Sequence, residues 1–169
     1  MEKHMKKLFT LLSLVITLSC INFIPAFASN VDDAELIRIN PNTSITSSPT
    51  KENHFEFTQG KSRISSDVSF TFSFNRGVLH SSTFQPRNST LQVNICASCS
   101  VHDSCYYYVF LMKEDSDTLV KKVKFYADSN EWGYTFSGLT PGADYYLDFS
   151  KNATCTGCID GEGQVSPIQ

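Results

Sequence analysis

The sequence is poor in charged residues and has no excess of positive charge. Charged residues make up 18% of the 169-residue chain, and 14 Lys and Arg against 17 Asp and Glu give a net charge of −3. Proteins that bind nucleic acid rely on clustered Lys and Arg to neutralise phosphates, so nucleic acid is not expected as a partner. No stretch of ten or more residues has apolar side chains at helical spacing, which excludes a coiled coil or a helical bundle.

The first 28 residues have the three parts of a secretory signal peptide. Met1–Lys7 is basic, Leu8–Ile24 is largely apolar, and the small residues of an A-x-A pattern end at Ala28. Signal peptidase requires small residues just before the cleaved bond. We therefore expect cleavage between Ala28 and Ser29 and a secreted, extracellular mature protein.

Two other fates of this segment stay open, an uncleaved membrane anchor and a lipoprotein lipidated on Cys20. After residue 28 there is no second long apolar run, so the mature chain is expected to have no membrane span. Residues 29–53 are polar and are expected to form a flexible leader, with a possible short strand at Leu36–Ile39. The remaining residues, 54–169, are enough for one domain.

From residue 54 onward, apolar and polar residues alternate with period two. Val68, Phe70, Phe72 and Phe74, for example, alternate with Ser and Thr, which is typical of a strand with one buried face. Strands are expected around 68–74, 91–95, 106–112, 123–125, 132–136 and 145–149. Turn-forming residues such as Gly, Pro, Asn and Asp separate them. This pattern predicts an all-β fold, an antiparallel β-sandwich.

One segment resembles a known family. Leu139, Pro141, Gly142 and Tyr145 match the Leu-x-Pro-Gly-x-x-Tyr pattern of fibronectin type III domains, and the resemblance extends over residues 132–167. It implies an Ig-like sandwich in which Tyr145 is a corner tyrosine, with its hydroxyl bonded to backbone a few residues upstream. A jelly roll or another β-sandwich remains an alternative.

The cysteines carry the strongest chemical signal. Cys96 and Cys99 form one C-x-x-C motif, Cys155 and Cys158 form a second, and Cys105 is an odd fifth thiol. In an Ig-like sandwich the loops that hold the two motifs lie at the same end. Because secretion exposes the chain to oxidation, we expect two disulfides that link one motif to the other. Cys105 would then be unpaired or would join two chains in a dimer.

Two further interpretations of the cysteines stay open. The same four motif cysteines are a suitable ligand set for tetrahedral zinc. One motif alone is the pattern of a dithiol redox site, although such sites usually begin a helix, and none is expected here.

The function predicted from these features is that of a binding or interaction module. The recognition surface is expected at the cysteine-rich loops, residues 96–105 and 152–162, because sandwich folds place function on loops. No catalytic constellation such as a G-x-S-x-G motif is present, so neither enzyme activity nor a cofactor is expected; a secreted zinc-binding or thiol-redox protein or enzyme remains the alternative.

The expected partner is a protein or a carbohydrate. Tyr106–Tyr108 must place at least one ring on the outer face of its strand, where it either stacks on such a ligand or is covered by the N-terminal segment. Sequons at Asn42, Asn88 and Asn152 are glycan acceptors if the source is eukaryotic.

Overall fold

The structure is a computed structural model, and it describes residues 36–40, 52–58, 63–101 and 105–168. The predicted signal peptide, its cleavage site and most of the predicted leader lie outside these residues. The described residues all belong to one compact unit, Val31–Gln169. None of the described segments forms a helix long and apolar enough to cross a membrane.

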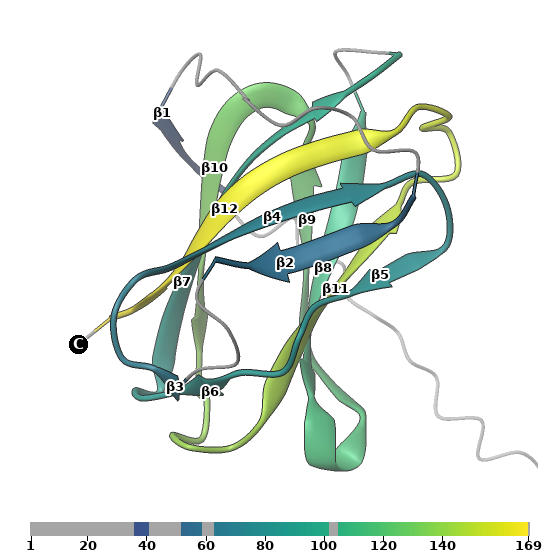
Figure 1. Cartoon of the computed structure of the whole chain (residues 1–169). Helices are drawn as coiled ribbons and strands as arrows, with labels where there is room; N and C mark the ends of the chain where they lie inside the picture. The colour runs from purple at the N-terminus through teal and green to yellow at the C-terminus, as the bar shows by residue number, and fades with distance from the viewer. Residues whose placement is uncertain (1–35, 41–51, 59–62, 102–104, 169) are drawn as a thin grey trace, which may run out of the picture. The chain divides into compact units, whose positions relative to one another are not determined.

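The described residues of this unit form twelve strands and one short 3₁₀ helix, η1 (Figure 1). The first six strands are β1 (Ile37–Asn40), β2 (His54–Phe57), β3 (Arg63–Ile64), β4 (Val68–Phe74), β5 (Val78–His80) and β6 (Gln85–Pro86). The others are β7 (Thr90–Cys99), β8 (Tyr106–Lys113), β9 (Thr118–Tyr126), β10 (Asp128–Ser137), β11 (Tyr145–Lys151) and β12 (Ile159–Pro167), with η1 (Glu114–Ser116) between β8 and β9. Every predicted strand is present, and the all-β class is confirmed.

The strands form two antiparallel sheets that face each other. The order in the larger sheet is β1-β10-β7-β12-β4-β2 and in the smaller sheet β5-β11-β8-β9, while β3 and β6 form a short parallel pair. The pairs β4·β12, β5·β11, β7·β10 and β8·β9 are nested, as in one long hairpin that has been rolled up. This is the connectivity of a jelly roll. The sandwich is therefore confirmed, whereas nothing in the strand order singles out the fibronectin type III family.

The core lies between the two sheets and is built largely of aromatic rings. Phe70, Phe72 and Phe74 alternate along β4 and point inward, where they are 0–2% exposed. From the opposite sheet, the ring of Phe149 stacks on Phe72 with centroids 4.8 Å apart, and Tyr107 packs against Phe74. The alternation read in the sequence thus has the predicted physical cause, one buried face per strand.

The turn between β10 and β11 is held by backbone and side-chain hydrogen bonds. Ala143 donates its N–H to the carbonyl of Thr140 at 3.2 Å, and Gly142 has a φ of +79°. Pro141 followed by a glycine with positive φ is typical of a type II turn. The Thr140 N–H donates to the Tyr145 hydroxyl oxygen at 3.0 Å, which joins the tyrosine to backbone upstream of it.

Candidate functional site

The outer face of the smaller sheet carries a row of aromatic rings. On β8, Tyr107 is fully buried whereas Tyr106, Tyr108 and Phe110 are half-buried on the opposite face. The ring centroids of Tyr106 and Tyr108 are 5.7 Å apart, and those of Tyr108 and Phe110 are 6.3 Å apart. The predicted outward tyrosine is therefore confirmed, and the rings form a continuous stripe along the strand.

Two lysines of the edge strand β9 lie over this stripe. The Lys122 ammonium is 3.8 Å from the ring centroid of Tyr108, and the Lys124 ammonium is 4.2 Å from that of Tyr106. Both contacts are within the range of cation–π interactions. Among the residues that the structure describes, neither lysine forms an ion pair with a carboxylate. We call the whole surface the aromatic face; it comprises Tyr106, Tyr108, Phe110, Lys122, Lys124, Tyr126, Tyr146, Asp148 and His80.

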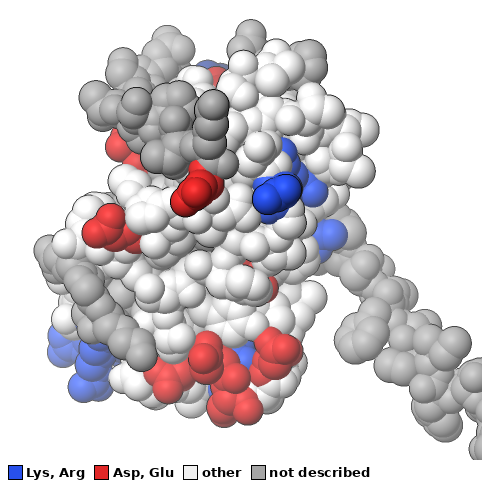
Figure 2. Space-filling view, turned by 45° about the vertical axis from the view of Figure 1, so that its right-hand side comes forward, with Lys and Arg blue, Asp and Glu red and all other residues white. Residues whose placement is uncertain are grey.

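Side chains of both signs are spread over the surface in the view of Figure 2. One small group of basic side chains lies to the right of the middle of this view and another lies at its lower left, and several acidic side chains gather at its lower end, at the height where Figure 1 places the β8–β9 connection. Glu114, Asp115 and Asp117 belong to that connection. An acidic ligand is therefore expected to meet repulsion at the β8–β9 connection.

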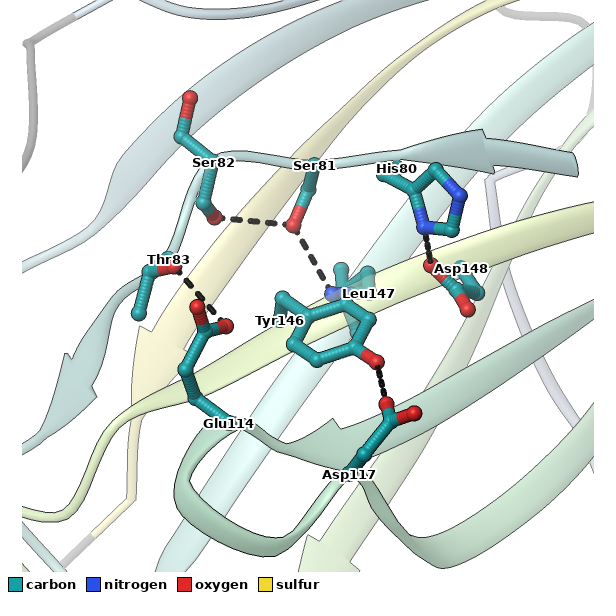
Figure 3. Close-up of polar contacts among 9 residues, drawn as sticks. All are labelled: His80, Ser81, Ser82, Thr83, Glu114, Asp117, Tyr146, Leu147 and Asp148. Carbon is teal, nitrogen blue, oxygen red and sulfur yellow. Dashed lines mark hydrogen bonds and ion pairs between the residues drawn. The ribbon is translucent and has the colours of Figure 1, made fainter.

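Polar side chains complete the aromatic face on β5 and β11 (Figure 3). His80 Nδ1 lies 2.6 Å from Asp148 Oδ1, and the Tyr146 hydroxyl donates to the Asp117 carboxylate. Burial raises the pKa of Asp148, against the opposing effect of His80. The bond to Asp117 is the main cause that raises the pKa of Tyr146 to about 12. The face therefore offers hydroxyl, imidazole and carboxylate groups beside the rings.

Further contacts in Figure 3 fix the chain that follows β5. Ser81 accepts a hydrogen bond from the Leu147 N–H at 2.8 Å and donates to the Ser82 carbonyl at 2.9 Å. Thr83 donates to Glu114 at 3.1 Å. These bonds attach the segment after β5 to β11 and to the β8–β9 connection, so this side of the face has a defined shape.

At one end of the sandwich, three cysteines form a cluster. Cys105, just before β8, is bonded to Cys155, in the β11–β12 connection, with Cα atoms 5.5 Å apart. The Sγ of Cys99, at the end of β7, is 2.7 Å from that of Cys105 and 3.6 Å from that of Cys155. We call Cys99, Cys105 and Cys155 the three-sulfur cluster.

This pairing corrects the role expected for Cys105, which was the odd thiol. Asn152 donates its N–H to the Tyr106 carbonyl, and Cys155 donates to the Asn152 carbonyl, so the turn 152–155 is held against the start of β8. The nearest sulfur to Cys155 is for that reason Cys105. While this disulfide is present, Cys105 has no thiol with which to form the predicted dimer.

The other two motif cysteines lie outside the cluster. Cys96 is 3% exposed within β7. The Sγ of Cys158 is 3.5 Å from the Ser73 hydroxyl and 3.9 Å from Asp160 Oδ1. Burial is the largest cause of the raised pKa of the Cys158 thiol. The structure therefore gathers one cysteine from each C-x-x-C motif with Cys105, rather than the two complete motifs.

The two cysteine-bearing loops do lie side by side. The Ser100 N–H donates to the Cys158 carbonyl at 3.0 Å, and the Cys158 N–H donates to the Ser100 hydroxyl at 3.0 Å. Lys151 donates to the Gly157 carbonyl at 2.7 Å.

The sequence analysis did not predict the aromatic–lysine stripe as a unit, because its rings and its lysines belong to different strands. The only sequence signal for it was the alternation of outward and inward residues within each strand.

No family model matches the sequence, and no curated protein matches it. Among solved structures, the chain is similar to the xylan-binding module CBM15, with 10% identity, a TM-score of 0.39 and coverage of 80% of this chain and 98% of that one. It is also similar to the K1 cleaved adhesin domain of Lys-gingipain from Porphyromonas gingivalis W83, with 13% identity, a TM-score of 0.37 and coverage of 80% and 100%. A third similar structure is the Gap123 complex from Streptococcus agalactiae, with 9% identity, a TM-score of 0.34 and coverage of 80% and 46%. Likeness at this level does not establish a shared function.

Proposed function

We propose that this protein is a secreted carbohydrate-binding module that holds an acidic polysaccharide on its aromatic face. The observation that carries the proposal is the stripe of three aromatic rings on β8 with two lysine ammoniums above it. Such a stripe offers stacking surface and positive charge within the same few ångströms.

The surface chemistry supports a sugar rather than a purely apolar partner. Sugar rings have an apolar C–H face and hydroxyl groups at the rim, and tyrosine combines a flat apolar ring with a polar tip. Tyr126, paired with Tyr106 at one end of the stripe, is 36% exposed; Val78, on the far edge strand β5, is 45% exposed, and Tyr146 and His80 supply polar groups. Exposed apolar groups that adjoin one another mark interaction surfaces.

The two lysines support an acidic sugar. Lys122 and Lys124 are held over rings, and no described carboxylate pairs with either of them. A carboxylate on a ligand would complete two charge-assisted contacts at once. The recognition surface predicted at the cysteine-rich loops remains a separate prediction; in this proposal the loops stabilise the scaffold.

Affinity electrophoresis of the purified protein in native gels tests the proposal. Gels contain polygalacturonate, its methyl ester, or polyglutamate as an anion without sugar rings. We expect retardation by polygalacturonate that weakens as salt rises, because exposed charge pairs are screened. The methyl ester and polyglutamate should each retard the protein less.

Variants of the face sharpen this test. Tyr108→Ala and Lys122→Gln should each weaken retardation by about tenfold, the effect of losing one contact worth about 1.4 kcal/mol. Lys121→Gln is the matched control, since Lys121 precedes Lys122 on β9 and lies on the opposite side of the strand. Equal retardation by polyglutamate, or loss of binding in the control alone, contradicts the proposal.

A further inference from the structure

The three-sulfur cluster holds one more sulfur than a disulfide needs. The Sγ atoms of Cys99, Cys105 and Cys155 all lie within 4.8 Å of one another. Cys105 and Cys155 are 5% and 6% exposed, whereas Cys99 is half-buried. Three sulfurs at this spacing, two of them shielded from water, are a suitable ligand set for one thiophilic metal ion.

The backbone holds each of the three sulfurs in place independently of the disulfide. Cys99 pairs with Ile159 in the ladder between β7 and β12. The carbonyl of Cys105 accepts the Ala127 N–H at 2.8 Å, and the Cys155 N–H donates to Asn152. Reduction of the disulfide would therefore leave three thiols that are still directed to one point. A site held by regular elements in this way needs little rearrangement to bind its ligand.

We propose that the reduced cluster is a three-thiolate site for a thiophilic divalent ion such as Zn²⁺, and that oxidation closes it. Two molecules of a small thiol reduce the Cys105–Cys155 bond and leave as their own disulfide. The ion then replaces the three thiol protons, which pass to the buffer. Exchange with a small-molecule disulfide re-oxidises Cys105 and Cys155 and yields two molecules of the small thiol, with protons taken up from the buffer; this removes two of the three ligands and releases the ion.

The surroundings suit such a centre. Three thiolates and one divalent ion carry a net charge of −1, and the ammonium of Lys151 lies close by, on the Gly157 carbonyl. A Cβ on Gly157 would lie 2.8 Å from the Sγ of Cys99, so the glycine leaves room beside that sulfur. Because Cys99 is half-buried, a water molecule has access to the fourth position of a tetrahedral ion.

This ligand set differs from the two C-x-x-C motifs taken together. The Sγ of Cys158 contacts Ser73 and Asp160 instead, and Cys96 is outside the cluster. The three-sulfur site therefore requires Cys105 and does not require Cys158. A zinc site made of the two C-x-x-C motifs would require Cys158 and would not require Cys105.

The wild-type protein provides the first test. The protein is reduced with a phosphine under argon and titrated with Co²⁺, whose thiolate complexes absorb strongly in the near ultraviolet. We expect saturation at one Co²⁺ per chain and no such absorption before reduction. Alkylation with iodoacetamide in saturating Zn²⁺, followed by peptide mass mapping, should show Cys99, Cys105 and Cys155 protected. Absence of a stoichiometric complex, or protection of a different set, overturns the proposal.

Two serine variants provide the second test. Cys105→Ser should lower the Co²⁺ affinity by more than about tenfold. Even the mutation of a residue that only hydrogen-bonds to a metal ligand lowers metal affinity by about 10–100-fold. Cys158→Ser, the matched control, should bind as wild type does. Near-ultraviolet circular dichroism shows whether each variant is folded. If a variant is not folded, the protection mapping of the wild-type protein decides which cysteines bind the ion. Retained binding in Cys105→Ser together with loss in Cys158→Ser assigns the ion to the two motifs and contradicts the three-sulfur site.

Discussion

Two adjacent tyrosines at the start of β11 have opposite environments. Tyr145 is 2% exposed and its hydroxyl oxygen accepts the Thr140 N–H, whereas Tyr146 lies on the aromatic face. Tyr145→Phe leaves a backbone N–H without its partner, so we expect a loss of about 1 kcal/mol in the free energy of unfolding. Urea denaturation measures this change, and Tyr146→Phe is the matched control with a smaller loss. Equal denaturation midpoints for wild type and Tyr145→Phe would show that the corner bond contributes nothing.

The phenol of Tyr146 should titrate far above its usual range. Its hydrogen bond to the Asp117 carboxylate favours the neutral form and raises its pKa from 10.0 to about 12. The folded chain thus holds this proton more tightly than the unfolded chain does. The contribution to stability is complete below pH 10 and is lost as the pH rises towards 12. Asp117→Asn should return the pKa towards 10, as followed by the ¹³C shift of the phenol carbon; an unchanged pKa would remove Asp117 as the cause.

The sequence was informative about residues whose partners are close along the chain. The corner bond lies within the contiguous segment 139–145, the segment that carries the resemblance to fibronectin type III domains, and that resemblance implied it. The contacts of Lys122 and Lys124 with the rings depend on how β8 and β9 pair, and that register includes an irregularity between Leu111 and Met112. A one-residue shift would turn those lysines to the other face, which is why the sequence alone did not predict the stripe.

At the scale of elements, β12 has no side chains at two inward positions. Gly161 and Gly163 face the core beside the rings of the neighbouring strand β4. A Cβ on Gly163 would lie 2.4 Å from Phe70 Cζ and 2.6 Å from the Asn94 carbonyl oxygen. Both neighbours are fixed, one in the core and the other in the backbone of β7. Gly163→Ala should therefore destabilise the fold by about 1–3 kcal/mol, as overpacked cores do.

The matched control for this glycine is Gln164→Ala, one residue further along β12 and on its outer face. We expect little change in the urea midpoint for the control and a clear decrease for Gly163→Ala. Similar midpoints in both variants would mean that β12 moves away from β4 at little cost and that the close approach of ring and strand does not limit the packing.

Most of the long strands were predictable from the sequence, and most of the short ones were not. β4, β7, β8, β10 and β11 each have at least seven residues, enough for period-two alternation to stand out. β3, β5 and β6 have two or three residues and exist because they pair with neighbours, not because of their own pattern. A possible short strand was expected at Leu36–Ile39, and β1, at Ile37–Asn40, pairs with β10 at the edge of the larger sheet.

At the scale of the whole molecule, the order of the strands depends on contacts that are distant in sequence. The outermost pair of the rolled hairpin joins β4 to β12, and no local pattern marks that contact. The resemblance at residues 132–167 covers the turn and the strands beside it, and similar corners are compatible with more than one sandwich topology. The disulfide partner of Cys155 was missed for the same reason, because it is decided by where β8 begins.

The Cys105–Cys155 disulfide ties the start of β8 to the connection before β12. It joins residues 50 positions apart, and loop closure of that length in the unfolded chain is worth roughly 4 kcal/mol in the chain-entropy model. Reduction in the presence of a chelator should therefore lower the free energy of unfolding by about 2–4 kcal/mol. Urea denaturation with and without reductant measures this, with Cys158→Ser as a control that keeps the effect. No change on reduction would indicate that the bond is absent from the native protein.

The most direct test of the carbohydrate-binding account is to map the ligand on the protein by NMR. A ¹⁵N-labelled sample is titrated with short oligogalacturonates, and backbone and lysine side-chain shifts are followed. The account predicts that the largest changes occur at Tyr106, Tyr108, Phe110, Lys122 and Lys124. Changes concentrated on the larger sheet or on the cysteine-rich loops, with these residues unaffected, would contradict it.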